Sequence, residues 1–272
     1  MDKLIEKNMS RKEFLKVAGT GLSLIMLESL LTKVNAKEIF NNVSKNVKRY
    51  AMVIDLRRCI GCEACTIACK VENNISLNYS FDKGKNITWN EVIFKEIGNY
   101  PKVQRKFWPR PCQHCENPPC IRVCPVNATY QDKERGLVLQ HYEKCIGCKS
   151  CAIACPYGAR YFNWSEPKWP VEREWLFNPD VELRTKGIIE KCTFCVHRIK
   201  KAEAKAKEEG REIKDGEIIP ACNLTCVGKA RFFGDLSDEN SIVSQIIKEN
   251  SDRVYVLEEH FGTKPKVFYL KS

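Results

Sequence analysis

The sequence lacks any long hydrophobic run beyond its first 36 residues, and its mean hydropathy of −0.38 excludes a polytopic membrane protein. It also lacks a phosphate-binding loop, a dinucleotide-binding glycine fingerprint and a nucleophile paired with a base. It therefore offers no recognisable substrate chemistry. Hydrophobic residues make up 43% of the 272-residue chain. This fraction supports a packed core and excludes a disordered or low-complexity chain.

Residues 1–36 are predicted to be a targeting segment. The charged stretch Ser10–Lys16 is followed by the apolar run Val17–Leu31 and by a small-residue cleavage site at Ala36. A membrane span needs about 20 apolar residues, so this run is too short to cross a bilayer. The charged stretch resembles a twin-arginine export signal in which Lys12 replaces the second arginine. We expect export to the extracytoplasmic (periplasmic) face of the cytoplasmic membrane, with attachment only through partners; the alternative is an ordinary amphipathic helix.

Cysteine is abundant, with 16 residues that fall into four groups of four and leave none over. Group one is Cys59, Cys62, Cys65 and Cys69; group two is Cys112, Cys115, Cys120 and Cys124; group three is Cys145, Cys148, Cys151 and Cys155; group four is Cys192, Cys195, Cys222 and Cys226. Groups one and three are identical at 8 of 11 positions, which indicates an internal duplication.

The spacing C-x2-C-x2-C-x3-C, followed by proline in group three, is the ligand pattern of bacterial ferredoxins. In that pattern three cysteines surround one iron–sulfur cluster, and Gly61 and Gly147 allow the loop backbone to approach it closely. Zinc is an alternative, but structural zinc sites usually combine two separated C-x2-C pairs. Disulfides between neighbours in such tight loops would be strained. The spacing therefore favours iron–sulfur clusters.

The fourth cysteine of a ferredoxin group ligates the other cluster of a pair. Groups two and three are separated by 20 residues, 125–144, which is the interval of a compact two-cluster ferredoxin. We expect these two groups to exchange their fourth ligands, which leaves groups one and four to pair. The alternative pairs group one with two and group three with four. The predicted ligand sets are set A (Cys59, Cys62, Cys65, Cys226), set B (Cys112, Cys115, Cys120, Cys155), set C (Cys145, Cys148, Cys151, Cys124) and set D (Cys192, Cys195, Cys222, Cys69).

The predicted fold class is α+β, with two bacterial-ferredoxin-like [4Fe–4S] modules, one inserted within the other, and long loops. Short strands at 50–56 and 137–141 are expected to lead into the cysteine loops, which short helices follow. The predicted divisions are an outer module (48–70 plus 185–236), an insertion (71–110), an inner module (111–165) and a C-terminal extension (237–272).

Several stretches resemble the iron–sulfur subunits of the dimethyl sulfoxide reductase family. They are Cys112–Cys120, Ala154–Phe162, Lys191–Arg198, Phe233–Asp235 and Gly262–Leu270, and the resemblance covers roughly residues 48–270. It implies four [4Fe–4S] clusters, because every ligand position is cysteine, and the same pairing of groups one with four and two with three. It also implies an electron-transfer subunit of an anaerobic respiratory oxidoreductase that is not catalytic by itself.

The resemblance implies two partners as well: a catalytic subunit of the molybdopterin type and an integral membrane subunit that reacts with quinone. The 26-residue gap between Cys195 and Cys222 is long for the family. This gap resembles that of iron–sulfur subunits in complexes that reduce quinone or accompany sulfite reduction. The alternative is thus a molybdenum-free membrane redox complex linked to sulfite reduction or multihaem cytochromes.

Other side chains near the cysteines are expected to have structural roles and not to bind the clusters. The cysteines already complete the ligand sets, so His114 and His197 are expected to form hydrogen bonds instead. The charged run His197–Glu209 is predicted to be a helix that ends at Gly210. The basic residues that precede three groups are expected to be solvated: Arg58, Lys144 and Lys191. Four isoleucines within the loops are expected to keep water from the clusters: Ile60, Ile67, Ile146 and Ile153.

The formal net charge of +11 would normally indicate a nucleic-acid or anionic membrane partner. Sixteen ligating thiolates would add −16, and four oxidised cluster cores would add about +8, because the charge of a bound metal belongs in the balance. The basic excess therefore offsets the clusters, and no nucleic-acid partner is expected.

Overall fold

The computed structural model describes residues 47–77, 86–169 and 177–271. The predicted targeting segment, 1–36, and part of the predicted insertion lie outside these residues. Within the described residues, no helix combines the length and the apolar character that a membrane crossing needs.

A four-stranded sheet joins the beginning and the end of the described chain. Its strands lie in the order β8 (Arg231–Asp235), β1 (Tyr50–Asp55), β10 (Val267–Leu270) and β9 (Val254–Tyr255). Strand β1 runs antiparallel to β8 and parallel to β10. Residues 237–272, which the sequence sets apart as an extension, thus supply β10, a strand inside the sheet, as well as β9 at its edge.

Alternate side chains of β1 belong to two different hydrophobic clusters, because successive residues of a strand point to opposite faces. Met52 and Ile54 pack on the side that contains the cysteines. Val53 packs on the other side, against Val243 and Ile247 of helix α8 (Ile242–Glu249). Every residue of β1 is buried. This strand therefore fixes the position of the loop that begins at Cys59.

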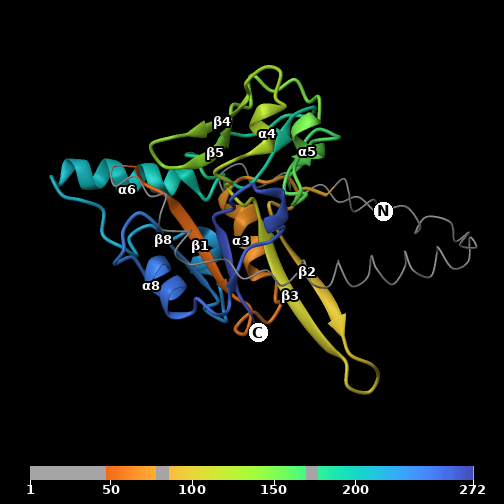
Figure 1. The fold of residues 1–272 in the computed structure, drawn as a ribbon. Helices are drawn as coiled ribbons and strands as arrows, with labels where there is room; N and C mark the ends of the chain where they lie inside the picture. The colour runs from red at the N-terminus through yellow and green to blue at the C-terminus, as the bar shows by residue number, and fades with distance from the viewer. Residues whose placement is uncertain (1–46, 78–85, 170–176, 272) are drawn as a thin grey trace, which may run out of the picture.

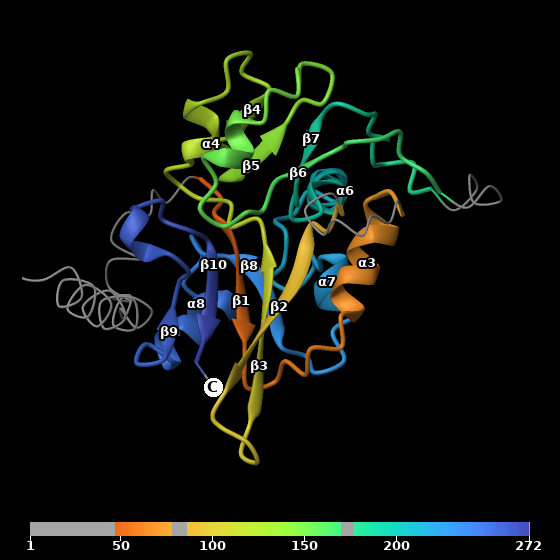
Figure 2. The same cartoon turned by 90° about the vertical axis from the view of Figure 1, so that its right-hand side faces the viewer.

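Short helices and two-stranded sheets surround the cysteine groups. The helices are α3 (Ala64–Glu72), α4 (Pro119–Arg122), α5 (Ser150–Ile153), α6 (Val196–Glu208), α7 (Ala221–Leu224) and the 3₁₀ turn η3 (Glu259–Phe261). The small sheets pair β4 (Thr129–Asp132) with β5 (Leu137–Gln140) and β6 (Tyr161–Phe162) with β7 (Ile189–Glu190). In Figures 1 and 2, β4, β5, α4 and α5 gather at one end of the molecule, away from α8. The predicted helix beginning near His197 is confirmed as α6, and Gly210 adopts a φ of 62° just beyond its end.

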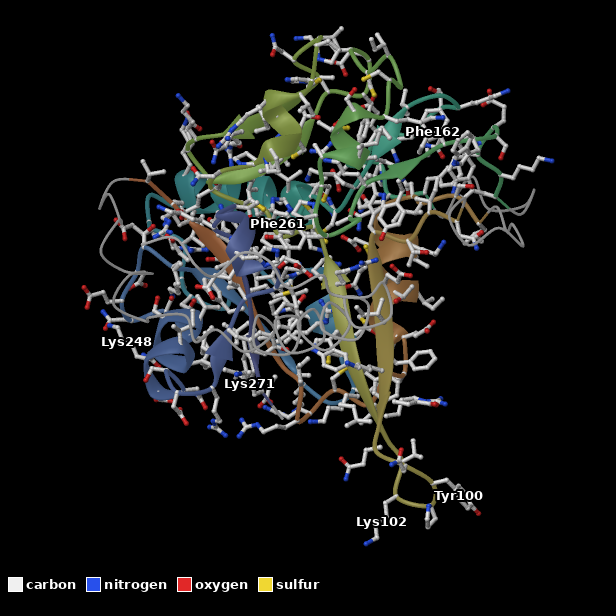
Figure 3. All side chains as sticks on the ribbon, turned by 45° about the vertical axis from the view of Figure 1, so that its right-hand side comes forward. Tyr100, Lys102, Phe162, Lys248, Phe261 and Lys271 are labelled. Carbon is white, nitrogen blue, oxygen red and sulfur yellow. The ribbon has the colours of Figure 1, made fainter. Side chains whose placement is uncertain are left out.

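A long hairpin extends beyond the rest of the described molecule (Figure 3). Strands β2 (Asn90–Ile97) and β3 (Gln104–Pro111) pair antiparallel along their whole length, from Asn90 opposite Pro111 to Ile97 opposite Gln104. Tyr100 and Lys102 lie at its tip, and Tyr100 is 93% exposed. Val92 and Pro109 line the cavity of Cys59, and Phe107 lies against Gly61 of the same cysteine loop. The predicted insertion therefore supplies one ordered arm as well as part of a cysteine-site wall.

Replacing Ser241 by alanine should destabilise the sheet layer that contains α8. The Ser241 hydroxyl accepts a hydrogen bond from the Ser244 backbone N–H and donates one to the Asp235 carbonyl at 2.6 Å. Loss of such a helix cap costs about 1 kcal/mol, which corresponds to a thermal midpoint lower by about 2–4 °C. Thermal melting followed by circular dichroism should detect the shift. Alanine at the exposed Ser251 is the control, and equal midpoints for both variants would contradict this role.

Candidate metal centres

All sixteen cysteines are free of disulfides. The structure brings them together in four sets, and each set combines three cysteines of one group with one of another. Two sets line cavities: Cys59, Cys62, Cys65 and Cys226 line one, and Cys124, Cys145, Cys148 and Cys151 line the other. These combinations are sets A and C of the sequence prediction.

The other two sets are recognised by the mutual influence of their sulfurs. Cys192, Cys195 and Cys222 raise the pKa of Cys69, after burial, which is the largest cause. The side-chain amide of Asn73 lies 3.6 Å from the Cys69 sulfur and 3.9 Å from the Cys195 sulfur. In the same way, Cys112, Cys120 and Cys155 contribute to raising the pKa of Cys115, after burial, which is the largest cause. These combinations match sets D and B.

Helix packing explains why each set draws on two groups. Helix α3, which contains Cys65 and Cys69, packs against α7, which contains Cys222. Helix α4, which contains Cys120, packs against α5, which contains Cys151. The two pairs of helices are equivalent, and each brings a fourth cysteine toward the three cysteines of its neighbour.

The duplicated loops also share a backbone conformation. Glu63 and Lys149 occupy the same position in groups one and three, and both adopt the left-handed conformation, with φ of 57° and 63°. Each directly precedes a helix that begins with the next residue. Gly147 has a φ of 64°, and a Cβ atom there would lie 1.9 Å from the Gly187 carbonyl oxygen. The loop can therefore pack this closely only with glycine at position 147.

Backbone N–H groups point at several of the sulfurs. The N–H of Ala230 donates to the Cys226 sulfur at 3.2 Å, and that of Ile189 donates to the Cys145 sulfur at 3.4 Å. Such donors stabilise negative charge on sulfur and tune the potential of a bound cluster. These N–H groups therefore favour the negatively charged form of the cysteine sulfurs.

Backbone donors favour the charged thiolate, whereas burial favours the neutral thiol. Burial is the main cause that raises the pKa of Cys115 and of Cys195 to about 12 and the pKa of Cys192 above its usual range. Without metal these thiols stay protonated at neutral pH, so loading a metal must release protons and replace them with cationic charge.

The donor sets fit clusters better than single ions. Among the described residues, no three histidine, cysteine or carboxylate side chains converge closely enough to hold one metal ion. The two cavities are nevertheless each lined by four cysteines. Four thiols arranged around a gap suit a [4Fe–4S] cube, whereas structural zinc requires four ligands converging on one ion.

Neighbouring sets follow one order through the molecule. The Cys65 sulfur of set A contributes to raising the pKa of Cys222 in set D, after burial, which is the largest cause. Set D is linked to set B through Cys192 and Cys112. Set B is linked to set C through Cys120 and Cys151. These neighbouring sulfurs predict the series A–D–B–C for the four sets.

One prediction about a neighbouring side chain is wrong. Lys191 is not solvated: it is completely buried, and its ammonium donates to the Cys192 carbonyl at 2.6 Å. The four loop isoleucines are exposed by 62% (Ile60), 59% (Ile67), 63% (Ile146) and 85% (Ile153). Ile60 and Ile146 nevertheless line the cavities of sets A and C. Their role in keeping water from the clusters stays a prediction. Local spacing placed these residues beside the cysteines, but it does not define which direction they face.

The predicted hydrogen-bonding role of the two histidines is confirmed. His114 is buried, accepts a hydrogen bond from the Val138 N–H at its Nδ1 and stacks on Phe194 with ring centroids 3.9 Å apart. His197 contacts the Glu72 carboxylate at 2.6 Å. Sequence reasoning missed two other buried residues, Arg160 and Arg231, which touch cysteine sulfurs. The signal that could have found them is a repeated spacing, since each is the fifth residue after the last cysteine of its group.

Comparison with known proteins agrees with these donor sets. Two models of a 4Fe-4S dicluster domain match residues 58–128 and 103–170. The chain is 42% identical to the iron–sulfur cluster-binding subunit of menaquinone reductase from Nitratidesulfovibrio vulgaris, over 82% of this chain and 88% of the relative. It is 41% identical to a protein of Halobacterium salinarum that is assigned as the iron–sulfur subunit of a dimethyl sulfoxide reductase, over 82% and 79%. It is 34% identical to a subunit of the selenate reductase of Mesobacillus selenatarsenatis, over 97% and 98%.

Replacing Gly147 by alanine should empty the site formed by set C. The new methyl group would collide with the Gly187 carbonyl, and the loop would have to move away. We expect about four fewer iron atoms per chain and the loss of one cluster signal in electron paramagnetic resonance (EPR) spectra. Gly210→Ala is the matched control, because Gly210 has a similar φ of 62° but nothing within 4 Å of the added atom. Full iron content in both variants would contradict the packing argument.

Proposed function

The chain belongs to the family of iron–sulfur (beta) electron-transfer subunits of the dimethyl sulfoxide reductase type, and from this membership we propose that it connects a catalytic subunit to a membrane subunit. It carries four [4Fe–4S] clusters. It is an electron-transfer subunit of an anaerobic respiratory oxidoreductase and is not catalytic by itself. Each bound cluster accepts and returns one electron. The remaining functions belong to the residues of the chain: they hold the clusters in series, exclude water and adjust the charge.

We propose that sets A, B, C and D are the ligand sets of the four clusters. Two observations support this assignment. The four cysteines of set A line one cavity, and the four cysteines of set C line another. In sets B and D, three cysteines raise the pKa of the fourth. The alternative, in which group one pairs with group two, would require α3 to exchange a ligand with α4. Helix α3 packs against α7 instead. The order A–D–B–C then gives a continuous electron path with sets A and C at its ends.

The two end sets lie beside exposed apolar residues. Val227 is 71% exposed next to Cys226, and Ile146 is 63% exposed next to Cys145. Cys62 and Cys148 are themselves exposed. Exposed apolar residues around a functional group mark surfaces that bind other proteins. We infer that the catalytic subunit covers one end and the integral membrane quinone-reactive subunit covers the other.

The catalytic partner that we propose is of the molybdopterin type. A second candidate is a molybdenum-free membrane complex linked to sulfite reduction or multihaem cytochromes, and the 42% identity to a menaquinone reductase subunit favours it. Metal analysis of the complex purified through a tag on this chain would separate the two. Molybdenum in stoichiometric amount supports the first candidate, whereas haem without molybdenum supports the second.

We further propose a nested arrangement of the two modules. The inner module, 111–165, would interrupt an outer module made of 48–70 and 185–236. Pairing of β1 with β8 across the intervening chain supports this arrangement. The same pairing would hold sets A and D in one module and sets B and C in the other.

Finally, we propose that the folded protein is exported by a twin-arginine-type signal in residues 1–36. Replacing Arg11 and Lys12 by glutamine should retain the protein in the cytoplasm, because that route recognises the basic pair. Cell fractionation followed by immunoblotting measures the distribution. Lys3→Gln together with Lys7→Gln is the matched control. Unchanged export of the Arg11/Lys12 variant would reject this signal.

The cluster content has a direct test. The purified chain should absorb broadly near 400 nm, bleach with dithionite and contain about sixteen iron atoms. A colourless protein that contains stoichiometric zinc would instead indicate a zinc-stabilised binding module.

Two neighbouring cysteines of α3 test the pairing. Cys65→Ser and Cys69→Ser should alter the EPR signals of different clusters, because Cys65 belongs to set A and Cys69 to set D. Cys226→Ser should alter the same signal as Cys65→Ser. If Cys124→Ser, rather than Cys226→Ser, reproduces the Cys65→Ser change, the alternative pairing is correct.

A further inference from the structure

Two buried arginines occupy equivalent positions in the two halves of the duplicated architecture. Arg160 is the fifth residue after Cys155, the last cysteine of group three, and Arg231 is the fifth after Cys226, the last of group four. Arg160 directly precedes β6, and Arg231 begins β8. Each is 6% exposed. The repeated spacing therefore places one cation in the interior of each half.

Arg160 lies between sets B and C. Its Nη2 donates to the Cys120 sulfur of set B at 3.1 Å. Its Nη1 donates to the hydroxyl of Thr129 and the side-chain carbonyl of Gln140, both at 3.1 Å. Burial alone lowers the pKa of Arg160, but the anionic sulfurs of Cys120 and of Cys151, in set C, raise it above its usual value. The guanidinium is thus close to sulfurs of both sets.

Arg231 occupies the corresponding position between sets A and D. Its Nη2 donates to the Cys65 sulfur of set A at 3.5 Å and to the side-chain oxygen of Asn90 at 2.7 Å. Its Nη1 contacts the Met52 sulfur at 3.4 Å. Burial lowers the pKa of Arg231, whereas the sulfurs of Cys222, in set D, and Cys65 raise it. This arginine is also shared by two sets.

Neither arginine has a carboxylate partner among the described residues. Their contacts are hydroxyl, amide, thioether and cysteine sulfur atoms. A third buried arginine, Arg184, is compensated by a carboxylate in the usual way, because it forms an ion pair with the buried Glu190 at 3.2 Å. A buried charge is costly unless an opposite charge compensates it. For Arg160 and Arg231 the available anions are the cysteine sulfurs.

We propose that each arginine raises the reduction potentials of both clusters of its pair, Arg231 for the clusters of sets A and D and Arg160 for those of sets B and C. The inference rests on the ligand sets proposed above. Reduction adds an electron to a cluster, and a fixed cation nearby stabilises the added negative charge, most strongly in a medium of low dielectric constant. Because each cation is shared, it raises the potentials of two neighbouring clusters together.

The test is a redox titration of the full chain with its clusters, followed by EPR, for Arg160→Gln and Arg231→Gln. The glutamine variants retain a hydrogen-bond donor but remove the charge. At a fixed ambient potential, the ratio of reduced to oxidised cluster should fall about tenfold for the affected pair, which is 59 mV for a one-electron couple. The other pair in the same molecule should be unchanged and serves as the internal control. Arg160→Lys and Arg231→Lys keep the charge and should lie closer to the unmodified protein.

Four unchanged potentials in glutamine variants that retain about sixteen iron atoms would overturn the inference while leaving the electron-transfer assignment intact. An equal shift of all four clusters would also overturn it, because that result indicates a general structural effect. An unmodified chain that contains no iron would instead reject the cluster assignment itself.

If a glutamine variant fails to assemble, the unmodified protein provides the decisive measurement. In protein labelled with ¹⁵N-arginine, reduced clusters should show a ¹⁵N hyperfine coupling from the guanidinium that donates to a cysteine sulfur. Absence of this coupling would contradict the contacts on which the inference depends.

Discussion

The constraint on which the structure depends is the burial of cysteine sulfurs beside one another. Nine of the sixteen cysteines are buried, and the sulfurs of one set raise the pKa of their neighbours. Such sets become stable only when bound metal, N–H donors and cations supply compensating charge. Two kinds of group meet this requirement. Backbone N–H groups of Ala230 and Ile189 donate to cysteine sulfurs, and so do the guanidiniums of Arg160 and Arg231. The basic excess of the sequence has the same origin.

The fold and the clusters depend on each other. Helices α4, α5 and α7 have four residues each, a length that is not stable in isolation. Ligand bonds from cysteines within them therefore contribute to keeping these helices in place. The longer elements do the reverse: β1 is buried on both faces and fixes the start of the first cysteine loop. The chain thus combines a sheet that packs through its own hydrophobic contacts with short helices that cluster ligation helps to hold.

Local spacing predicted much of the site, because ligation depends on residues that are close in sequence. The strands near 50 and 137, helix α6 and the cysteines that line the two cavities could be read from it. Side-chain environments could not be read in this way. Lys191 precedes a cysteine but is buried, and Ile153 lies between two cysteines but is 85% exposed. These outcomes depend on segments distant in sequence, such as residues 267–270, which pair with β1 across more than two hundred residues.

The central claim is that four [4Fe–4S] clusters lie in the order A–D–B–C along one chain. Anomalous diffraction at the iron absorption edge, measured on crystals of the protein with its clusters, tests this claim most directly. We expect four separate peaks, with the peak beside Cys192 and Cys69 lying between those of sets A and B, and each peak surrounded by four cysteine sulfurs. Fewer than four peaks, single metal ions at the cysteine sites or a different order of the peaks would contradict it.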